Sequence, residues 1–222
     1  MNGSANGESD AAREGVAVAV VIFTVRLDAL SVLLVHRAAP PYAERWALPG
    51  GLLLEDEALD QAAARKLVSE TGVGDVYLEQ LYTFDAPPGP ARARATVTYF
   101  ALVDEGRVQL EARPSWQPDW FPVNDLPELA FDNDRVIAYA LRRLQAKLGY
   151  SNVVYSLLPE RFTLTQLQRV YEAIVGDSLD KRNFRKRILS LDVVEPTAQM
   201  RQAGAHRPAR LYRFSRREPE TF

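Results

Sequence analysis

The side chains most capable of binding or catalysis lie on a predicted helix over residues 57–71. Lys66, Ser69 and Glu70 are spaced i, i+3 and i+4, so they share one face of that helix. One carboxylate beside an ammonium group is a poor site for Mg²⁺, which prefers several oxygen ligands. The lysine can itself contact a phosphate. This face therefore favours contact with a phosphate over binding of Mg²⁺.

A second candidate surface is the basic helix predicted over residues 180–191. Phe184, Ile188 and Leu191 fall on one face, where they can anchor the helix to a domain. The cationic side chains fall elsewhere, and arginine can pair with guanine while any cation neutralises phosphate. A solvated basic helix without a partner has the same composition. The residues that we assign to DNA binding are Thr163, Thr165, Gln166, Lys181, Arg182, Asn183, Arg185, Lys186, Arg187, Arg207, Arg210 and Arg213.

Charge divides the chain at about residue 150. Residues 1–150 carry 14 Lys and Arg against 21 Asp and Glu, a net charge of −7, and residues 151–222 carry 13 against 8, a net charge of +5. A change of sign between two halves indicates two domains with different partners, and the basic half is the candidate for nucleic acid.

The hydrophobic pattern of the first half predicts a layered domain of strands and helices. Residues 116–129 are expected to be irregular. The expected strands cover 15–25, 31–37, 77–84 and 95–103, and the expected helices cover 57–71 and 134–148.

The second half predicts three helices and a hairpin. A short helix over 152–158 precedes one that begins at Thr163, with Gln166 completing a capping box, and ends at Gly176. After the basic helix, short strands are expected over 193–195 and 209–214, with a polar loop over 196–208. This order describes a winged helix-turn-helix domain.

Composition excludes several classes of protein. The chain has no cysteine, which rules out disulfides and thiolate chemistry and is compatible with the cytoplasm, where we expect the protein. His36 and His206 are too few for a histidine metal site. The apolar run from Val16 to Phe23 is far shorter than the roughly 20 residues of a membrane span, so no membrane partner is expected. We predict a disordered segment over 1–14, domains over 15–149 and 150–216, and a tail over 217–222.

The segment that begins at Gly51 resembles the Nudix box, the signature of a family of Mg²⁺-dependent pyrophosphatases. Lys66 and Ser69 stand where the box has glutamates that hold the metal. The flanking sequences TrpAlaLeuProGlyGly at 46–51 and TrpPheProVal at 120–123 are similar to the ADP-ribose-handling branch. The residues that match the box are Gly51, Glu57, Arg65, Leu67, Glu70, Gly72 and Val73. The resemblance implies a Nudix fold, a mixed sheet sandwiched by helices, that binds an ADP-ribose-type effector without efficient catalysis, so no catalytic residue and no required cofactor are expected.

Several side chains are candidates for that effector. The resemblance implies that Glu57 and Arg65 form a bracing salt bridge. Trp46 and Tyr42 can stack on a base, although filling the core is the more common use of an aromatic residue. Arg37 follows a predicted strand, and its side chain is expected either to contact a phosphate of the effector or to lie in solvent. The full set that we assign to the effector is Arg37, Trp46, Gly50, Gly51, Arg65, Lys66, Glu70, Arg92 and Arg94.

The second half resembles the C-terminal domain of the Nudix-related transcriptional regulators, the NrtR family. The residues that carry this resemblance are PheThrLeuThrGlnLeuGln at 162–168, LeuAspLysArgAsnPheArgLysArg at 179–187 and ProAlaArgLeuTyrArgPhe at 208–214. The resemblance implies an α+β chain that acts as a homodimeric repressor of NAD-metabolism genes, binds a roughly palindromic DNA site and senses ADP-ribose or a related nucleotide or sugar phosphate.

Two other functions fit the same residues. An active ADP-ribose pyrophosphatase, with Mg²⁺ and an accessory basic domain, would show Mg²⁺-dependent turnover that is lost in Glu70→Gln. A nucleotide-binding adaptor that uses the basic domain on protein or RNA would lack sequence-selective binding to duplex DNA.

Overall fold

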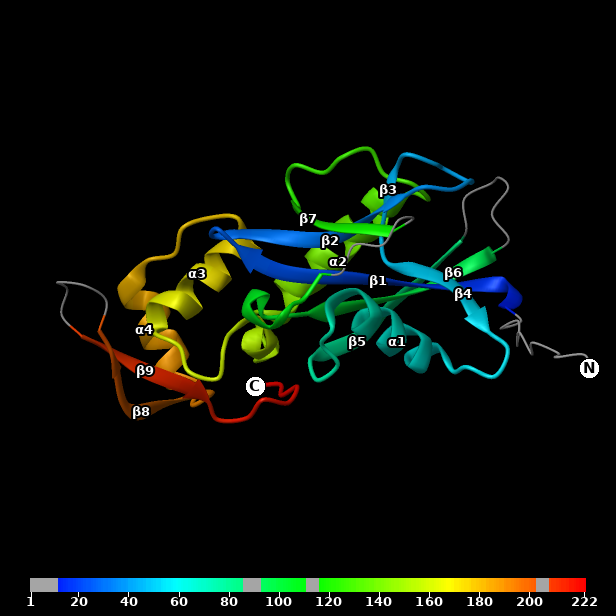
Figure 1. Ribbon diagram of the computed structural model, residues 1–222. Coiled ribbons are helices and arrows are strands. Elements are labelled where there is room, and N and C mark those ends of the chain that lie inside the picture. The colour runs from blue at the N-terminus through cyan, green and yellow to red at the C-terminus, as the bar shows by residue number, and fades with distance from the viewer. Residues whose placement is uncertain (1–11, 86–92, 111–115, 203–207) are drawn as a thin grey trace, which may run out of the picture.

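A computed structural model describes residues 12–85, 93–110, 116–202 and 208–222 of the chain. Figure 1 shows the strands of a central sheet with α1 and α2 beside them, and α3, α4, β8 and β9 gathered at one end of the molecule. The predicted fold class, a mixed α+β domain followed by a winged helix, is confirmed. No helix among these residues is long and apolar enough to cross a membrane.

Within the described residues, seven strands form the large sheet, with the order β3-β2-β1-β6-β5, while β4 pairs with β1 and β7 pairs with β2. The neighbours β1 and β6 are parallel and the other pairs are antiparallel, so the sheet is mixed. The strands are β1 Ala12–Arg26, β2 Ala29–Arg37, β3 Trp46–Ala47, β4 Gly50–Leu54, β5 Tyr77–Asp85, β6 Ala93–Leu102 and β7 Trp116–Pro122.

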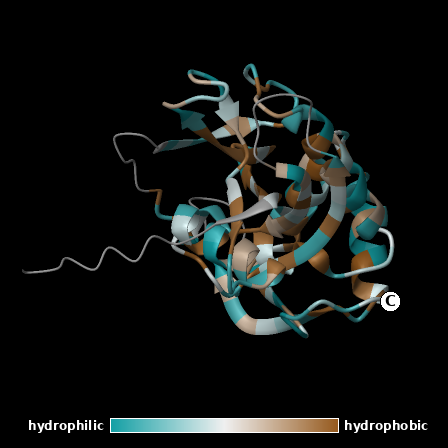
Figure 2. Cartoon of the chain, turned by 90° about the vertical axis from the view of Figure 1, so that its right-hand side faces the viewer, coloured by the Kyte–Doolittle hydropathy of each residue, from teal (hydrophilic) through white to brown (hydrophobic). Residues whose placement is uncertain are grey.

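The sheet is buried on both faces, which explains why β1 reads as an unbroken apolar run. Val18, Val20 and Ile22 share a core with α1 (Leu59–Thr71), whereas Val21 and Phe23 share one with α2 (Asn133–Lys147). Figure 2 shows hydrophobic residues along the interior strands and hydrophilic residues in many of the surrounding loops and outer helix faces.

Strand β7 corrects the prediction that residues 116–129 are irregular. It pairs with β2 from Ser31 opposite Pro122 to Arg37 opposite Trp116. The segment carries Pro118 as well as Pro122, and proline hides a strand pattern because it cannot donate to a ladder. Strand β7 pairs with β2 along one edge, and an edge strand tolerates proline because its outer edge needs no ladder donor.

The second domain contains η2 (Val153–Leu157), α3 (Leu164–Val175), α4 (Lys181–Ser190), β8 (Val194–Arg201) and β9 (Ala209–Phe214). The predicted capping box is confirmed, since Thr163 Oγ1 accepts from Gln166 N at 3.2 Å and Gln166 Oε1 accepts from Thr163 N at 2.9 Å. Gly176 ends α3 with φ 82°, a conformation that favours glycine.

Two details of this domain differ from the prediction. The first helix is a 3-10 turn, and β8 extends to Arg201 although residues 196–208 are predicted as a loop. The register of the β8–β9 pair shifts between Pro196 and Met200, and this irregularity interrupts the alternating pattern that would mark a strand in the sequence.

The two domains share one hydrophobic core. Residues 151–158 are buried, and Val153 and Val154 belong to the same cluster as Phe100 of the sheet and Leu167 of α3. The predicted tail also packs here, because Arg217 donates hydrogen bonds to the carbonyls of Tyr155, Leu158 and Pro159 at 2.8–3.1 Å. The junction is therefore packed structure rather than an exposed linker.

Candidate functional site

The start of α1 is braced by an ion pair. Arg65 Nε and Nη2 donate to the two carboxylate oxygens of Glu57 at 2.6 and 2.7 Å. The hydrogen bonds from Arg65 lower the pKa of Glu57 below its usual value. These two parallel hydrogen bonds fix the loop before α1 relative to the helix, as the family resemblance implies.

The face that follows the brace joins Lys66, Ser69 and Glu70. The Ser69 hydroxyl lies 3.1 Å from Glu70 Oε1 and 3.0 Å from the carbonyl of Lys66, and Glu70 is buried. A methyl group placed on Gly51 would lie 3.4 Å from Cε and Nζ of Lys66. The end of the Lys66 side chain therefore lies beside Gly51 of β4.

These side chains do not fit Mg²⁺, the ion that the Nudix fold implies. The shared face offers one carboxylate, one hydroxyl and one ammonium group, and the ammonium repels a cation. Among the residues that the structure describes, no cluster of three His, Cys, Asp or Glu side chains is placed to hold a metal ion.

Gly50 has a steric reason to be glycine. A methyl group at this position would lie 2.6 Å from the carbonyl oxygen of Val18, because β4 runs close against β1. Gly51 is exposed beside Lys66. The pair therefore brings bare backbone next to an ammonium group, an arrangement that suits an anionic ligand.

Arg37 braces a loop. Its Nε donates to the carbonyl of Pro41 at 3.0 Å, and its guanidinium lies 4.8 Å from the ring centre of Phe131. Burial lowers the pKa of Arg37. Tyr42 meets the same Phe131 ring edge-on at 4.8 Å. Both predicted ligand candidates therefore have a structural partner in Phe131, which precedes α2 in the chain.

Trp46 is a partly buried core residue. It meets Phe121 at 4.6 Å and His36 at 5.2 Å, edge-on in both cases. Asn133 of α2 is a buried side chain whose Oδ1 accepts from the backbone N of Leu48 at 2.8 Å. This contact holds the segment that carries Trp46 and Gly50 against α2.

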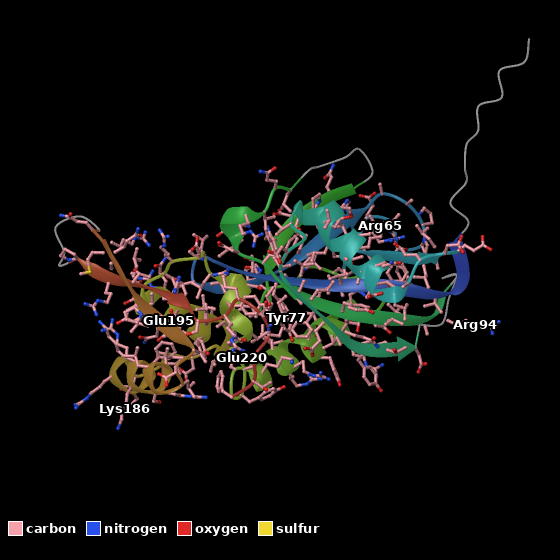
Figure 3. The ribbon with its side chains drawn as sticks, turned by 90° about the horizontal axis from the view of Figure 1, so that it is seen from below. Arg65, Tyr77, Arg94, Lys186, Glu195 and Glu220 are labelled. Carbon is pink, nitrogen blue, oxygen red and sulfur yellow. The ribbon has the colours of Figure 1, made fainter. Side chains whose placement is uncertain are left out.

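The two remaining candidates for the effector are Arg92 and Arg94. Arg92 lies outside the described residues, and Arg94 lies on β6 with its side chain exposed. Figure 3 places Arg94 at the end of the molecule opposite Lys186 of the basic helix. Arg94 and Lys186 thus lie at separate ends of the molecule.

Helix α4 presents its cations to solvent. Phe184 and Ile188 are buried, and the ring of Tyr171 on α3 meets Phe184 at 5.2 Å, where burial raises the pKa of the tyrosine to about 12. Asp180 caps the helix by accepting from Asn183 N at 2.8 Å. The exposed members of the predicted set are Lys181, Arg182, Asn183, Lys186 and Arg187.

The N-terminal end of α3 lies beside α4. Thr163 and Gln166 are engaged with each other in the capping box, and Thr163 is buried. Thr165 is exposed, and its Oγ1 accepts a hydrogen bond from Nη2 of Arg185 at 3.4 Å. The structure thus divides the predicted group into two capping residues and an arginine–threonine pair.

The β8–β9 hairpin, which is the wing of this domain, contributes further cations. Arg210 is exposed on β9, while Arg213 pairs with Glu195 of β8 at 3.0 Å. Arg207 lies outside the described residues. Sequence reasoning missed Arg201, which is exposed on β8 opposite Ala209, because that part of β8 is predicted as loop.

Comparison with known families gives two matches along the chain. The NUDIX domain model matches residues 13–144, and the model of the NrtR DNA-binding winged helix domain matches residues 154–214. The ADPR responsive transcriptional repressor NtrR of Acinetobacter baylyi is 39% identical over 203 residues, which cover 89% of this chain and 81% of that protein. The chain belongs to the NrtR family.

Solved structures of NrtR proteins agree with both halves. Shewanella oneidensis NrtR complexed with a 27mer DNA superposes with a TM-score of 0.80 at 37% identity, covering 90% of this chain and 93% of that chain. The Nudix domain of the same protein complexed with ADP ribose superposes with a TM-score of 0.52 at 37% identity, covering 60% of this chain and 89% of that chain.

Proposed function

We propose that this NrtR-family chain is a transcriptional repressor that binds duplex DNA through α4 and the β8–β9 wing, and that ADP-ribose bound to its Nudix domain changes its affinity for DNA. The observation that carries the proposal is the match to the DNA complex of S. oneidensis NrtR over 90% of this chain. The repressor of A. baylyi and the ADP-ribose complex support the same effector.

The Nudix side of the proposal is binding without efficient hydrolysis. Lys66 places a positive charge beside Gly51, where it can meet a phosphate, while Ser69 and Glu70 leave the helix face with one carboxylate. The effector contacts that we propose are Arg37, Trp46, Gly50, Gly51, Arg65, Lys66, Glu70, Arg92 and Arg94.

The DNA side rests on the placement of the cations. Lys181, Arg182 and Lys186 are exposed on a helix whose opposite face is buried, so they can approach a groove without unfolding the domain. Each phosphate that they neutralise releases counterions and makes binding dependent on salt. We also propose a homodimer, which would place two such helices on a roughly palindromic site, and a domain boundary between residues 149 and 150.

Selection from a pool of random duplexes, followed by fluorescence anisotropy, tests the proposal. We expect the purified chain to enrich one sequence and to bind it at least a thousandfold more tightly than a scrambled duplex, on the order expected for specific DNA binding. Added ADP-ribose should weaken this binding, whereas AMP serves as the control. Binding that ignores sequence, or that favours RNA, would contradict the proposal.

A hydrolase assay tests the Nudix side separately. With Mg²⁺ and ADP-ribose, phosphatase-coupled phosphate release should stay far below common enzyme turnover of about 10 s⁻¹. The double variant Lys66→Glu/Ser69→Glu should bind Mg²⁺ more tightly in calorimetry, because it adds two carboxylates to the face of Glu70. Rapid turnover by the unmodified chain, lost in Glu70→Gln, would show an active pyrophosphatase instead.

A further inference from the structure

Arg185 differs from the other cations of α4. Its side chain is half-buried, whereas Lys181, Arg182, Lys186 and Arg187 are exposed. Its Nε atom is buried and has no hydrogen-bond partner among the residues that the structure describes. Its Nη2 donates to Oγ1 of Thr165 on α3, at 3.4 Å.

These contacts restrict how the guanidinium can be oriented. The stem of Arg185 is confined where its Nε is buried, and Thr165 holds one nitrogen at the far end. The planar fork of arginine presents its remaining N–H donors in a fixed direction once the stem is confined. Ordering the side chain therefore costs less conformational entropy when a ligand arrives.

A fixed fork suits a base edge better than a phosphate. Guanine offers two acceptors, O6 and N7, in the major groove, and an arginine that meets both must arrive in one geometry. A phosphate accepts a cation from many directions, so flexible exposed side chains such as Lys186 satisfy it. The two kinds of side chain on α4 thus match two kinds of contact.

We propose that Arg185 reads a guanine in the major groove and that Thr165 is a positioning residue that orients its guanidinium. The exposed cations around it then supply the sequence-independent attraction to phosphate. This inference rests on the proposed function, because it requires that α4 enters a duplex.

The test uses the full chain and the duplex that it selects from a random pool. Arg185→Lys keeps the charge and removes the fork, Thr165→Val removes the orienting oxygen, and Thr165→Ser restores it. Lys186→Ala is the matched control on the same helix. Binding is measured to the selected duplex, to each single-base variant of it and to a scrambled duplex, at several salt concentrations. Thermal unfolding of each variant verifies that it is folded.

We expect Arg185→Lys to lower the preference for one guanine in each half-site by on the order of tenfold to a hundredfold, with little change on scrambled DNA. Thr165→Val should lower the same preference by a smaller factor, and Thr165→Ser should recover it. Lys186→Ala should weaken binding to all duplexes alike and reduce the salt slope.

Two results would overturn the inference in different ways. If the chain selects a sequence but Arg185→Lys and Thr165→Val keep every base preference, Arg185 contacts phosphate or only braces α3 against α4. If the unmodified chain selects no sequence at all, the proposed function fails together with the inference.

Discussion

At the scale of single residues, the Nudix box of this chain keeps its bracing pair while its metal-binding face has changed. Glu57 and Arg65 form a two-fold hydrogen-bonded ion pair, and the face beyond it carries Lys66 and Ser69 next to Glu70. The ion pair thus fixes the helix relative to the loop before it. The face beyond it offers one carboxylate, whereas Mg²⁺ prefers several oxygen ligands.

The bracing pair predicts a dependence on pH. Because the pKa of Glu57 is lower in the folded chain than in the unfolded chain, its stabilising effect is fully present above the unfolded pKa, near 4.5, and is lost as the pH falls through the lower folded value. Urea unfolding should therefore show wild type more stable than Glu57→Gln at pH 7, with the difference shrinking below about pH 4.5. A difference that is constant from pH 7 to pH 3 would argue against the ion pair.

At the scale of elements, α3 packs against the buried face of α4. Tyr171 of α3 packs on Phe184, and the capping box at Thr163 fixes the start of α3, two residues before Thr165, which meets Arg185. The position of the basic helix therefore depends on how well α3 is formed.

Thr163→Ala tests this dependence. The substitution removes the cap on Gln166 N, so we expect the free energy of unfolding to fall by about 1 kcal/mol. Hydrogen exchange at the first turn of α3 should become faster, whereas exchange in the sheet should not change. Thr163→Ser is the control, since it keeps the accepting oxygen. Equal stability of the alanine and serine variants would contradict the role of the cap.

The same elements show what a sequence can predict. Periodic apolar positions and a terminal glycine were enough for α3, because both are local signals. Strand β7 was missed because Pro118 and Pro122 hide it. The Arg185–Thr165 contact joins residues twenty positions apart, and the pairing of Arg213 with Glu195 requires the register of β8. Such tertiary contacts leave no periodic trace in the chain.

At the scale of the whole molecule, contacts outside the shared core also join the domains. Arg169 of α3 lies 3.7 Å from Asp28 in the turn between β1 and β2, and Gln145 of α2 donates to the carbonyl of Ile174 at 2.9 Å. These contacts line a groove of about 800 Å³ between the two domains. Strand β1 pairs with β4 at Gly51 and leads to the turn that carries Asp28, so the same strand contacts β4 and ends beside the residue that meets Arg169 of α3.

Arg217→Ala tests how the junction holds the domains. Loss of the hydrogen bonds to the carbonyls of residues 155–159 should lower the free energy of unfolding by about 2 kcal/mol. Hydrogen exchange over residues 150–159 should accelerate more than exchange in the sheet. Arg216→Ala provides the control, because Arg216 is exposed and its ion-pair partner is Glu220. If both variants unfold alike, the contribution of Arg217 to the junction is negligible.

The segment over residues 217–222 joins the start of the winged-helix domain to its end. Asn152 bonds through its backbone and side chain to Glu220, and Phe222 N donates to the carbonyl of Tyr150 at 2.9 Å. Residues 150–152 and 220–222, which flank α3, α4 and the β8–β9 hairpin in the chain, are therefore fixed to each other at one place in the molecule.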